Sequence, residues 1–136
     1  MQFTTAFIAA AIADFSFAMP TTEKRFVSGQ CGIHVTQFQK NENGVGSEYQ
    51  FTVQIKDAVG DGIGGVKGQA IADRTSFDIL PGPSNELPAK LTLTAGSVDS
   101  DPITFAYNGQ SWSSSSGCST GGYQNGNREM DCGFAC

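Results

Sequence analysis

Few side chains in this sequence could act as catalytic groups, and histidine is the scarcest. The 136 residues include one histidine, His34, and no Gly-x-Ser-x-Gly motif. Serine-type nucleophilic catalysis normally needs a histidine base. The secreted ribonucleases of similar size pair two histidines with a glutamate and an arginine, for which Glu48 and Arg74 are available here. The sequence therefore favours a non-enzymatic protein, with a small ribonuclease or hydrolase using His34 as the alternative.

Four aspartates in two loops are candidates for a calcium site. Asp57 and Asp61 flank a glycine-rich stretch, and Asp99 and Asp101 lie in an Asp-Ser-Asp-Pro segment. Clustered carboxylates and backbone carbonyls from loops at one end of a β-sandwich suit Ca²⁺. Neither loop has the EF-hand spacing, and Asp and Gly are also ordinary turn residues. We expect no obligatory cofactor and keep Ca²⁺ binding as an alternative.

Three aromatic residues are candidates for ligand binding, namely Tyr107, Trp112 and Tyr123. Exposed aromatic rings provide flat, apolar contacts for sugars in many binding modules. A domain of this size also needs its large side chains inside, so Trp112 could instead pack over a disulfide at Cys118. The aromatic residues thus support two interpretations, a carbohydrate-binding surface and an extension of the core.

Four cysteines in a short chain predict two disulfides. Cys132 and Cys136 are too close in sequence to join across an extended segment. We favour Cys118–Cys132 with Cys31–Cys136, because the second bond would tie the ends of the domain together. The pairing of Cys31 with Cys132 and Cys118 with Cys136 remains an alternative.

The N-terminus predicts secretion. Residues 3–13 form an apolar run of signal-peptide length, too short to cross a bilayer as a helix, and Ser16-Phe17-Ala18 resembles a cleavage site. Lys24-Arg25 is typical of a second processing site. We therefore expect a signal peptide over residues 1–18, a pro-segment over 19–25 and one extracellular domain over 26–136. The alternatives are an N-terminal core helix and an ordinary exposed charge pair.

The charge of the predicted domain argues against two classes of partner. Residues 26–136 contain six Lys and Arg against eleven Asp and Glu, which leaves a net charge of −5. An acidic surface without a basic run does not suit nucleic acids or anionic membranes. We expect neither nucleic-acid binding nor membrane insertion.

The pattern of apolar residues predicts an all-β fold. Tyr49, Phe51, Val53 and Ile55 alternate with polar residues, as in a strand with one buried face. No part of residues 26–136 has helical spacing. We expect a single small β-sandwich or barrel of six to seven short strands, with residues 111–136 as an irregular tail or final hairpin pinned by disulfides. The expected strands span 32–38, 49–56, 66–72, 76–80, 91–95 and 103–107.

Four segments resemble small secreted cysteine-rich proteins of filamentous fungi, including hypersensitive-response-inducing elicitors of plants. They are QCGIHVTQFQKNE (30–42), YQFTVQIKD (49–57), VDSDPITFAY (98–107) and GGYQNGNREMDCGFAC (121–136). The resemblance covers essentially the whole predicted domain, and it implies an effector-like or elicitor-like protein without known catalytic residues. We therefore expect a secreted, monomeric interaction protein that triggers plant defence or cell death. Its partner would be a host-surface or cell-wall component, either protein or glycan. An extracellular carbohydrate- or Ca²⁺-binding module is the alternative.

Overall fold

The computed structural model describes residues 26–136, and the predicted signal peptide and pro-segment lie outside them. Within this range the chain forms strands and no helix, which confirms the predicted all-β class. Accordingly, the described part of the chain contains no helix that could span a membrane. The nine strands are β1 (Gln30–Phe38), β2 (Tyr49–Lys56), β3 (Gly62–Ile71), β4 (Ser76–Ile79), β5 (Leu91–Thr94), β6 (Thr104–Tyr107), β7 (Gln110–Ser113), β8 (Cys118–Thr120) and β9 (Asn127–Ala135).

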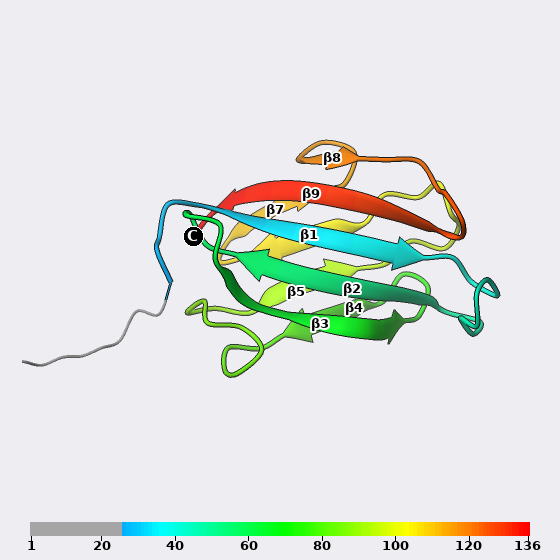
Figure 1. Cartoon of the computed structure of the whole chain (residues 1–136), viewed down its shortest axis with the longest axis horizontal. Helices are drawn as coiled ribbons and strands as arrows, with labels where there is room; N and C mark the ends of the chain where they lie inside the picture. The colour runs from blue at the N-terminus through cyan, green and yellow to red at the C-terminus, as the bar shows by residue number, and fades with distance from the viewer. Residues whose placement is uncertain (1–25) are drawn as a thin grey trace, which may run out of the picture.

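The strands form two antiparallel sheets that pack face to face as a sandwich. The five-stranded sheet has the order β3-β2-β1-β9-β8, and the four-stranded sheet has the order β4-β5-β6-β7. Most strands pair with the next strand in sequence, and the chain crosses between the sheets after β3 and after β7. β9 returns between β8 and β1, so that the last strand pairs with the first in the middle of the larger sheet (Figure 1).

Alternation decides which side chains enter the core. Along β1 and β2 every second residue is buried, as the apolar spacing predicts, while the residues between face outward. β5 and β6 repeat this pattern with Leu91, Leu93, Phe105 and Tyr107 on the inner side. The two inner faces together form one apolar core.

The C-terminal segment is no irregular tail: β8 and β9 form the expected final hairpin, pinned by the Cys118–Cys132 disulfide, and β7 precedes it. Residues 110–135 supply three strands, and β9 is a nine-residue central strand. Met130, Cys132 and Phe134 point inward from β9 at alternate positions. This alternation indicates a strand, although the high Ser and Gly content of the segment suggests irregular structure. The structure therefore has nine strands where the sequence predicts six to seven.

The hairpin between β6 and β7 follows from two residues. Asn108 and Gly109 both have positive φ, at 47° and 82°, and they directly join paired strands. This is the geometry of a type I′ turn, for which Asn-Gly is the preferred sequence. The turn places β7 beside β6 and starts the return toward the larger sheet.

The glycine-rich stretch after β2 is also more ordered than predicted. β3 begins at Gly62 and not near Val66, and its pairing with β2 is irregular between Val53 and Phe51 and again near Lys56. Gly64 and Gly65 have φ of 157° and 144°, and a Cβ on either would collide with a backbone carbonyl oxygen, that of Ser84 or Val53. Glycine is needed here because the backbone passes so close to its neighbours.

Both disulfides lie in or beside the five-stranded sheet. Cys31 at the start of β1 is bonded to the C-terminal Cys136, and Cys118 of β8 is bonded to Cys132 directly opposite on β9. This is the pairing favoured from the sequence. The bonds are consistent with an extracellular or otherwise oxidising environment.

Candidate functional site

His34 lies on the outer face of the five-stranded sheet between two carboxylates. The register of β1 with β9 places His34 opposite Asp131 and Thr36 opposite Glu129. The His34 Nδ1 atom lies 2.7 Å from Asp131 Oδ1, and its Nε2 atom makes a short contact with Glu129 Oε1. Both imidazole nitrogens are therefore engaged across the strand pair.

This arrangement favours the charged form of the ring. The hydrogen bond to Asp131 raises the pKa of His34, partial burial opposes the shift, and the hydrogen bond to Glu129 adds to it. In the charged form both ring nitrogens donate, and each donates to a carboxylate. A general base needs an available nitrogen, which the imidazolium does not offer. The cluster is suited to tie β1 to β9 and to present a fixed pattern of charge.

A shallow hollow of about 360 Å³ adjoins the cluster. Its floor is formed by Gly32 and Gly133, which are paired across β1 and β9 and carry no side chains. Lys56, which is paired with Gly32 on the other side, supplies a cation at the rim. The hollow thus brings His34, Asp131 and Lys56 beside two glycines, with the Gln30 side chain lying against Gly133.

The other residues considered for ribonuclease chemistry lie elsewhere. His34 is opposite Gln54 on β2, whereas Glu48 precedes the first residue of that strand, six positions away. Arg74 lies in the turn between β3 and β4, beyond the Tyr49–Ile71 pair. The structure brings neither residue to His34, and the partners that it does supply, Glu129 and Asp131, are 95 and 97 residues away in sequence.

Asp57 organises the turn that follows β2. Its carboxylate accepts hydrogen bonds from the backbone N–H groups of Val27 at 3.0 Å, Val59 at 3.1 Å and Asp61 at 2.9 Å. The bond from Val27 is the largest cause of a lowered Asp57 pKa. The carboxylate is occupied by its own turn and by the chain entering β1.

Asp101 plays the corresponding part in the loop between β5 and β6. Its Oδ2 atom accepts from the backbone N–H groups of Ser97 and Val98 and from the Ser97 hydroxyl, and the bond from the Ser97 backbone is the main cause of a lowered pKa. Asp99 accepts from the Tyr49 hydroxyl at 2.7 Å and from Gln39 at 2.6 Å.

The four aspartates do not form one cluster. Asp99 contacts Tyr49 at the beginning of β2, while Asp57 and Asp61 follow its end, so the two loops lie at opposite ends of the sandwich. Within residues 26–136, no group of three His, Cys, Asp or Glu side chains is placed to hold a metal ion. The Asp57 and Asp101 carboxylates accept hydrogen bonds within their own loops, and the Asp99 carboxylate accepts from Tyr49 and Gln39.

Of the candidate aromatic residues, Tyr107 belongs to the core and Trp112 is partly buried against it. Tyr107 is only 2% exposed, and its ring lies edge-on to Phe134 at 5.1 Å between centroids. Trp112 stacks between Phe105 and Phe134 at 5.7 and 5.4 Å. Of the two interpretations, the structure therefore supports packing of Trp112 against the core over an exposed aromatic surface for sugars.

Tyr123, the third candidate, packs over the buried side chain of Arg128. The sequence alone does not identify Arg128 as a buried residue. Arg128 packs against the Tyr123 ring at 4.9 Å, and the Tyr123 hydroxyl donates to the Asp99 carbonyl oxygen. Burial raises the pKa of Tyr123 to about 12. Arg128 Nε donates to Gln37 Oε1 at 2.9 Å, directly across β1 and β9, and a second nitrogen donates to the Asp101 carbonyl oxygen. This group fixes the loop of residues 97–101.

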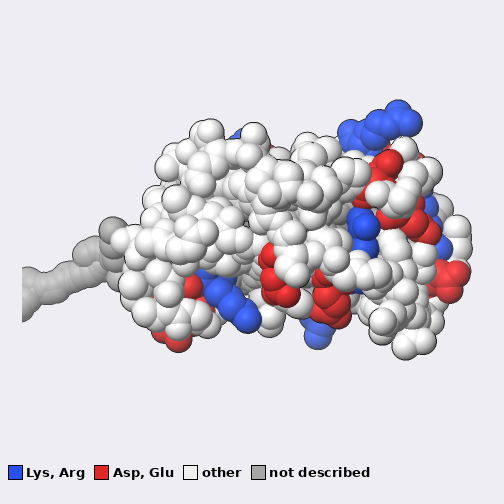
Figure 2. Space-filling view, turned by 90° about the horizontal axis from the view of Figure 1, so that it is seen from above, with Lys and Arg blue, Asp and Glu red and all other residues white. Residues whose placement is uncertain are grey.

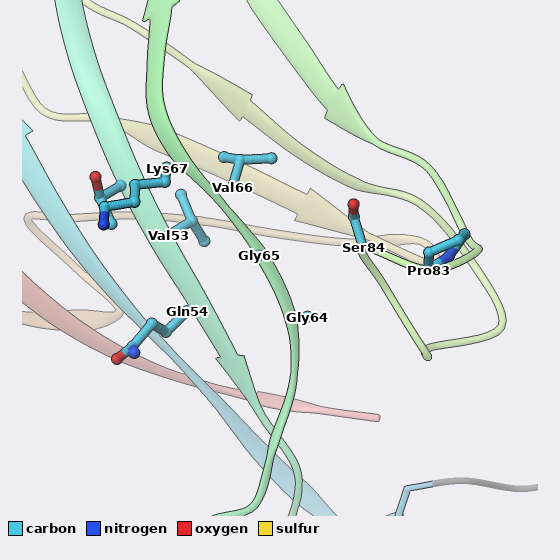
Figure 3. Close-up of a pocket in the computed structure, with 9 residues that line it drawn as sticks. Val53, Gln54, Gly64, Gly65, Val66, Lys67, Pro83 and Ser84 are labelled. Carbon is cyan, nitrogen blue, oxygen red and sulfur yellow. The ribbon is translucent and has the colours of Figure 1, made fainter.

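Another hollow, of about 490 Å³, lies along the irregular part of β3. Figure 3 shows Gly64 and Gly65 running between Gln54 on one side and Pro83 and Ser84 on the other, with Lys67 farther along. Lys67 is its only ionisable lining residue. The hollow has no pair of groups for acid–base chemistry.

Comparisons with known protein families, with curated proteins and with solved structures found no match for the chain. The candidate site is therefore argued from its geometry alone. It is an imidazole with both nitrogens hydrogen-bonded, on the outer face of the sheet that carries the disulfides.

Proposed function

We propose that this protein is a secreted, effector- or elicitor-like interaction protein that acts through its folded surface and not through catalysis. Plant defence or cell death would be its consequence, and a host-surface or cell-wall component its partner. The observation that carries the proposal is the engagement of His34 by Asp131 and Glu129 on an outer sheet face, with no other imidazole in the sequence.

The disulfides support this proposal. An extracellular recognition protein must keep the conformation of its binding surface outside the cell, where intracellular chaperones are absent. Here the first strand is bonded to the C-terminal residue, and the short edge strand β8 is bonded to β9. The faces of the sheets are consequently fixed before any partner arrives, which lowers the entropic cost of binding.

The test is infiltration of plant leaf with the oxidised domain of residues 26–136, which contains all nine strands and both disulfides. Reduced and alkylated protein is the control for the fold, and His34→Gln is the control for catalysis. We expect cell death and an oxidative burst with the oxidised protein and with His34→Gln, and none with the reduced protein. No response to the oxidised protein at any dose, or an equal response to the reduced chain, would contradict the proposal.

A small ribonuclease or hydrolase is the second candidate, because the structure does bring carboxylates to His34. Prolonged incubation with RNA and with glycan substrates, at pH values above and below neutrality, distinguishes the two. If the protein is a non-enzymatic interaction protein, we expect the RNA and glycan substrates to remain unchanged. Turnover that His34→Gln abolishes would favour the enzyme.

A further inference from the structure

The outer face of the four-stranded sheet consists almost entirely of small hydroxyl side chains. The strand register aligns Ser76, Thr94, Thr104 and Ser113 in one row across all four strands. A parallel row consists of Asp78, Thr92, Ala106 and Ser111. We call the six hydroxyl residues of these rows the hydroxyl face: Ser76, Thr92, Thr94, Thr104, Ser111 and Ser113.

These hydroxyls form a regular grid that is open to solvent. Neighbouring strands lie about 4.8 Å apart, and alternate residues along a strand are separated by about 6.8 Å. All six side chains are exposed or half-buried. Figure 2 looks down on the edge of the sandwich and shows a large uncharged area in its upper left part, with charged side chains along the lower edge and toward the right.

Some of the hydroxyls are already oriented by their neighbours. The Ser76 and Thr94 hydroxyl oxygens are 2.7 Å apart, and Thr92 donates to Asp78 at 2.6 Å. Within residues 26–136, the Thr104 and Ser111 side chains make no hydrogen bond. The face thus offers both fixed hydroxyls and hydroxyls with free bonding capacity.

A hollow continues the grid at one end. It has a volume of about 480 Å³ and shares Thr92 and Ala106 with the second row. Lys90, Asn108 and Gln110 complete its polar lining, and Asn108 is placed there by the positive-φ turn of the β6–β7 hairpin. The hollow gives the face a recess that could receive one unit of a longer polymer.

The chemistry of the face selects one class of partner. Protein interfaces are enriched in aromatic residues and Arg, and neither occurs in the two rows. Polyanions need several cations, but the two rows themselves contain no Lys or Arg, and the nearby Lys90 lies 3.3 Å from Asp78. Hydroxyl groups both donate and accept, so they match a surface that itself consists of hydroxyls.

We infer that the hydroxyl face binds a neutral, hydroxyl-rich polysaccharide, with one sugar unit in the adjoining hollow. The inference rests on the proposed function, for which it names a glycan as the cell-wall partner. It moves the carbohydrate site from a Tyr107–Trp112 platform to the outer side of the same sheet, where Tyr107 contributes only as one of the residues that line the hollow.

Depletion from solution by insoluble polysaccharide tests the inference. The probes are insoluble β-1,3-glucan, cellulose and chitin, with polygalacturonate as an anionic control. We expect the oxidised protein to bind at least one neutral polymer, with equal affinity in low salt and in 1 M NaCl. Absence of binding to all three neutral polymers would overturn the inference, and so would binding that salt abolishes.

Two variants with the same change in charge locate the contact. Thr104→Lys puts a bulky cation in the middle of the grid, and Gln50→Lys puts one on the outer face of β2, two register rows from His34. We expect Thr104→Lys to weaken binding about tenfold or more and Gln50→Lys to leave it unchanged. Equal effects would contradict the assignment.

A milder variant covers the case in which Thr104→Lys does not fold. Thr104→Val with Ser111→Ala removes two hydroxyls with little change in volume, and unchanged binding by this folded variant would overturn the inference. Binding without a leaf response would refute the elicitor role alone. A leaf response without polysaccharide binding would refute the hydroxyl face alone.

Discussion

The two outer faces of the sandwich are built from different chemistry. The five-stranded sheet presents His34, Glu129, Asp131 and Lys56, and both disulfides involve its strands or their ends. The four-stranded sheet presents rows of hydroxyls and contains no cysteine. The disulfides and the His34 ion pairs are thus concentrated on one sheet, while the outer face of the other has, within residues 26–136, only the Ser76–Thr94 and Thr92–Asp78 hydrogen bonds and the Lys90–Asp78 ion pair between its side chains.

The reason for this division lies in the topology. The five-stranded sheet contains both ends of the described chain, because β9 pairs with β1, while the four-stranded sheet is one continuous meander. Strands at chain ends fray unless they are tied down. Cross-strand ion pairs and disulfides are therefore most useful where the two ends meet.

The largest effects should come from removing the disulfides of the five-stranded sheet. Cys31 and Cys136 are separated by 105 residues, and Cys118 and Cys132 by 14. In the chain-entropy model, replacing the first pair by serine costs roughly 4.7 kcal/mol and replacing the second roughly 3 kcal/mol. Denaturant unfolding of the two double variants measures both losses. A larger loss for the Cys118–Cys132 pair would contradict this ranking and show that the edge strand matters more than the chain ends.

A smaller effect is expected from His34, and it should depend on pH. Since the folded state raises the pKa of His34, its ion pairs contribute fully below the unfolded value of 6.5 and are lost as the pH rises through the folded value. We expect His34→Gln to cost roughly 0.5–1 kcal/mol at pH 6 and much less at pH 9. Thermal unfolding at the two pH values, in low and high salt, provides the measurement.

The pH window of His34 is separate from that of the aspartates. The pKa values of Asp57 and Asp101 are lowered from 3.8, so the stability that these carboxylates contribute is present above that value and is lost as the pH falls further. If the His34→Gln variant still lost stability between pH 6 and pH 9, another titrating group would be responsible for the pH dependence. The stabilising role assigned to His34 with Asp131 and Glu129 would then be wrong.

The smallest effect on stability is expected on the hydroxyl face. Thr104→Val keeps the β-branched shape and removes a hydroxyl that makes no hydrogen bond within the described residues, so we expect a change within about 0.5 kcal/mol. Thermal unfolding beside the wild type, at pH 6 and pH 9, tests this. A clear loss of stability would show that the hydroxyls support the fold and would remove the contrast between the faces.

The strands that the sequence predicts well are those in which apolar and polar residues alternate. Tyr49 to Ile55 is the clearest case, and the structure reproduces it as β2 almost residue for residue. For the last three strands the sequence predicts no more than a final hairpin without strand bounds, because Ser and Gly dominate their surroundings. The Asn108-Gly109 turn and the spacing of Met130, Cys132 and Phe134 were the local signals that could have found β7 and β9.

The candidate site could not be predicted in the same way. His34 meets Asp131 and Glu129 only because β9 returns beside β1, and no local pattern specifies that pairing. The hydroxyl face likewise depends on the register of four strands, since its first row draws one residue from each. The buried Arg128 is a further case, since its charge suggests a surface position until β9 is known to be central.

The most direct test of the division between the two faces compares Thr104→Lys and His34→Gln in the same two assays, polysaccharide depletion and the pH dependence of thermal unfolding. We predict that Thr104→Lys loses binding and keeps the fall in stability between pH 6 and pH 9. His34→Gln should keep binding and lose that pH dependence. Loss of both properties in either variant, or loss of binding in His34→Gln alone, would contradict the account.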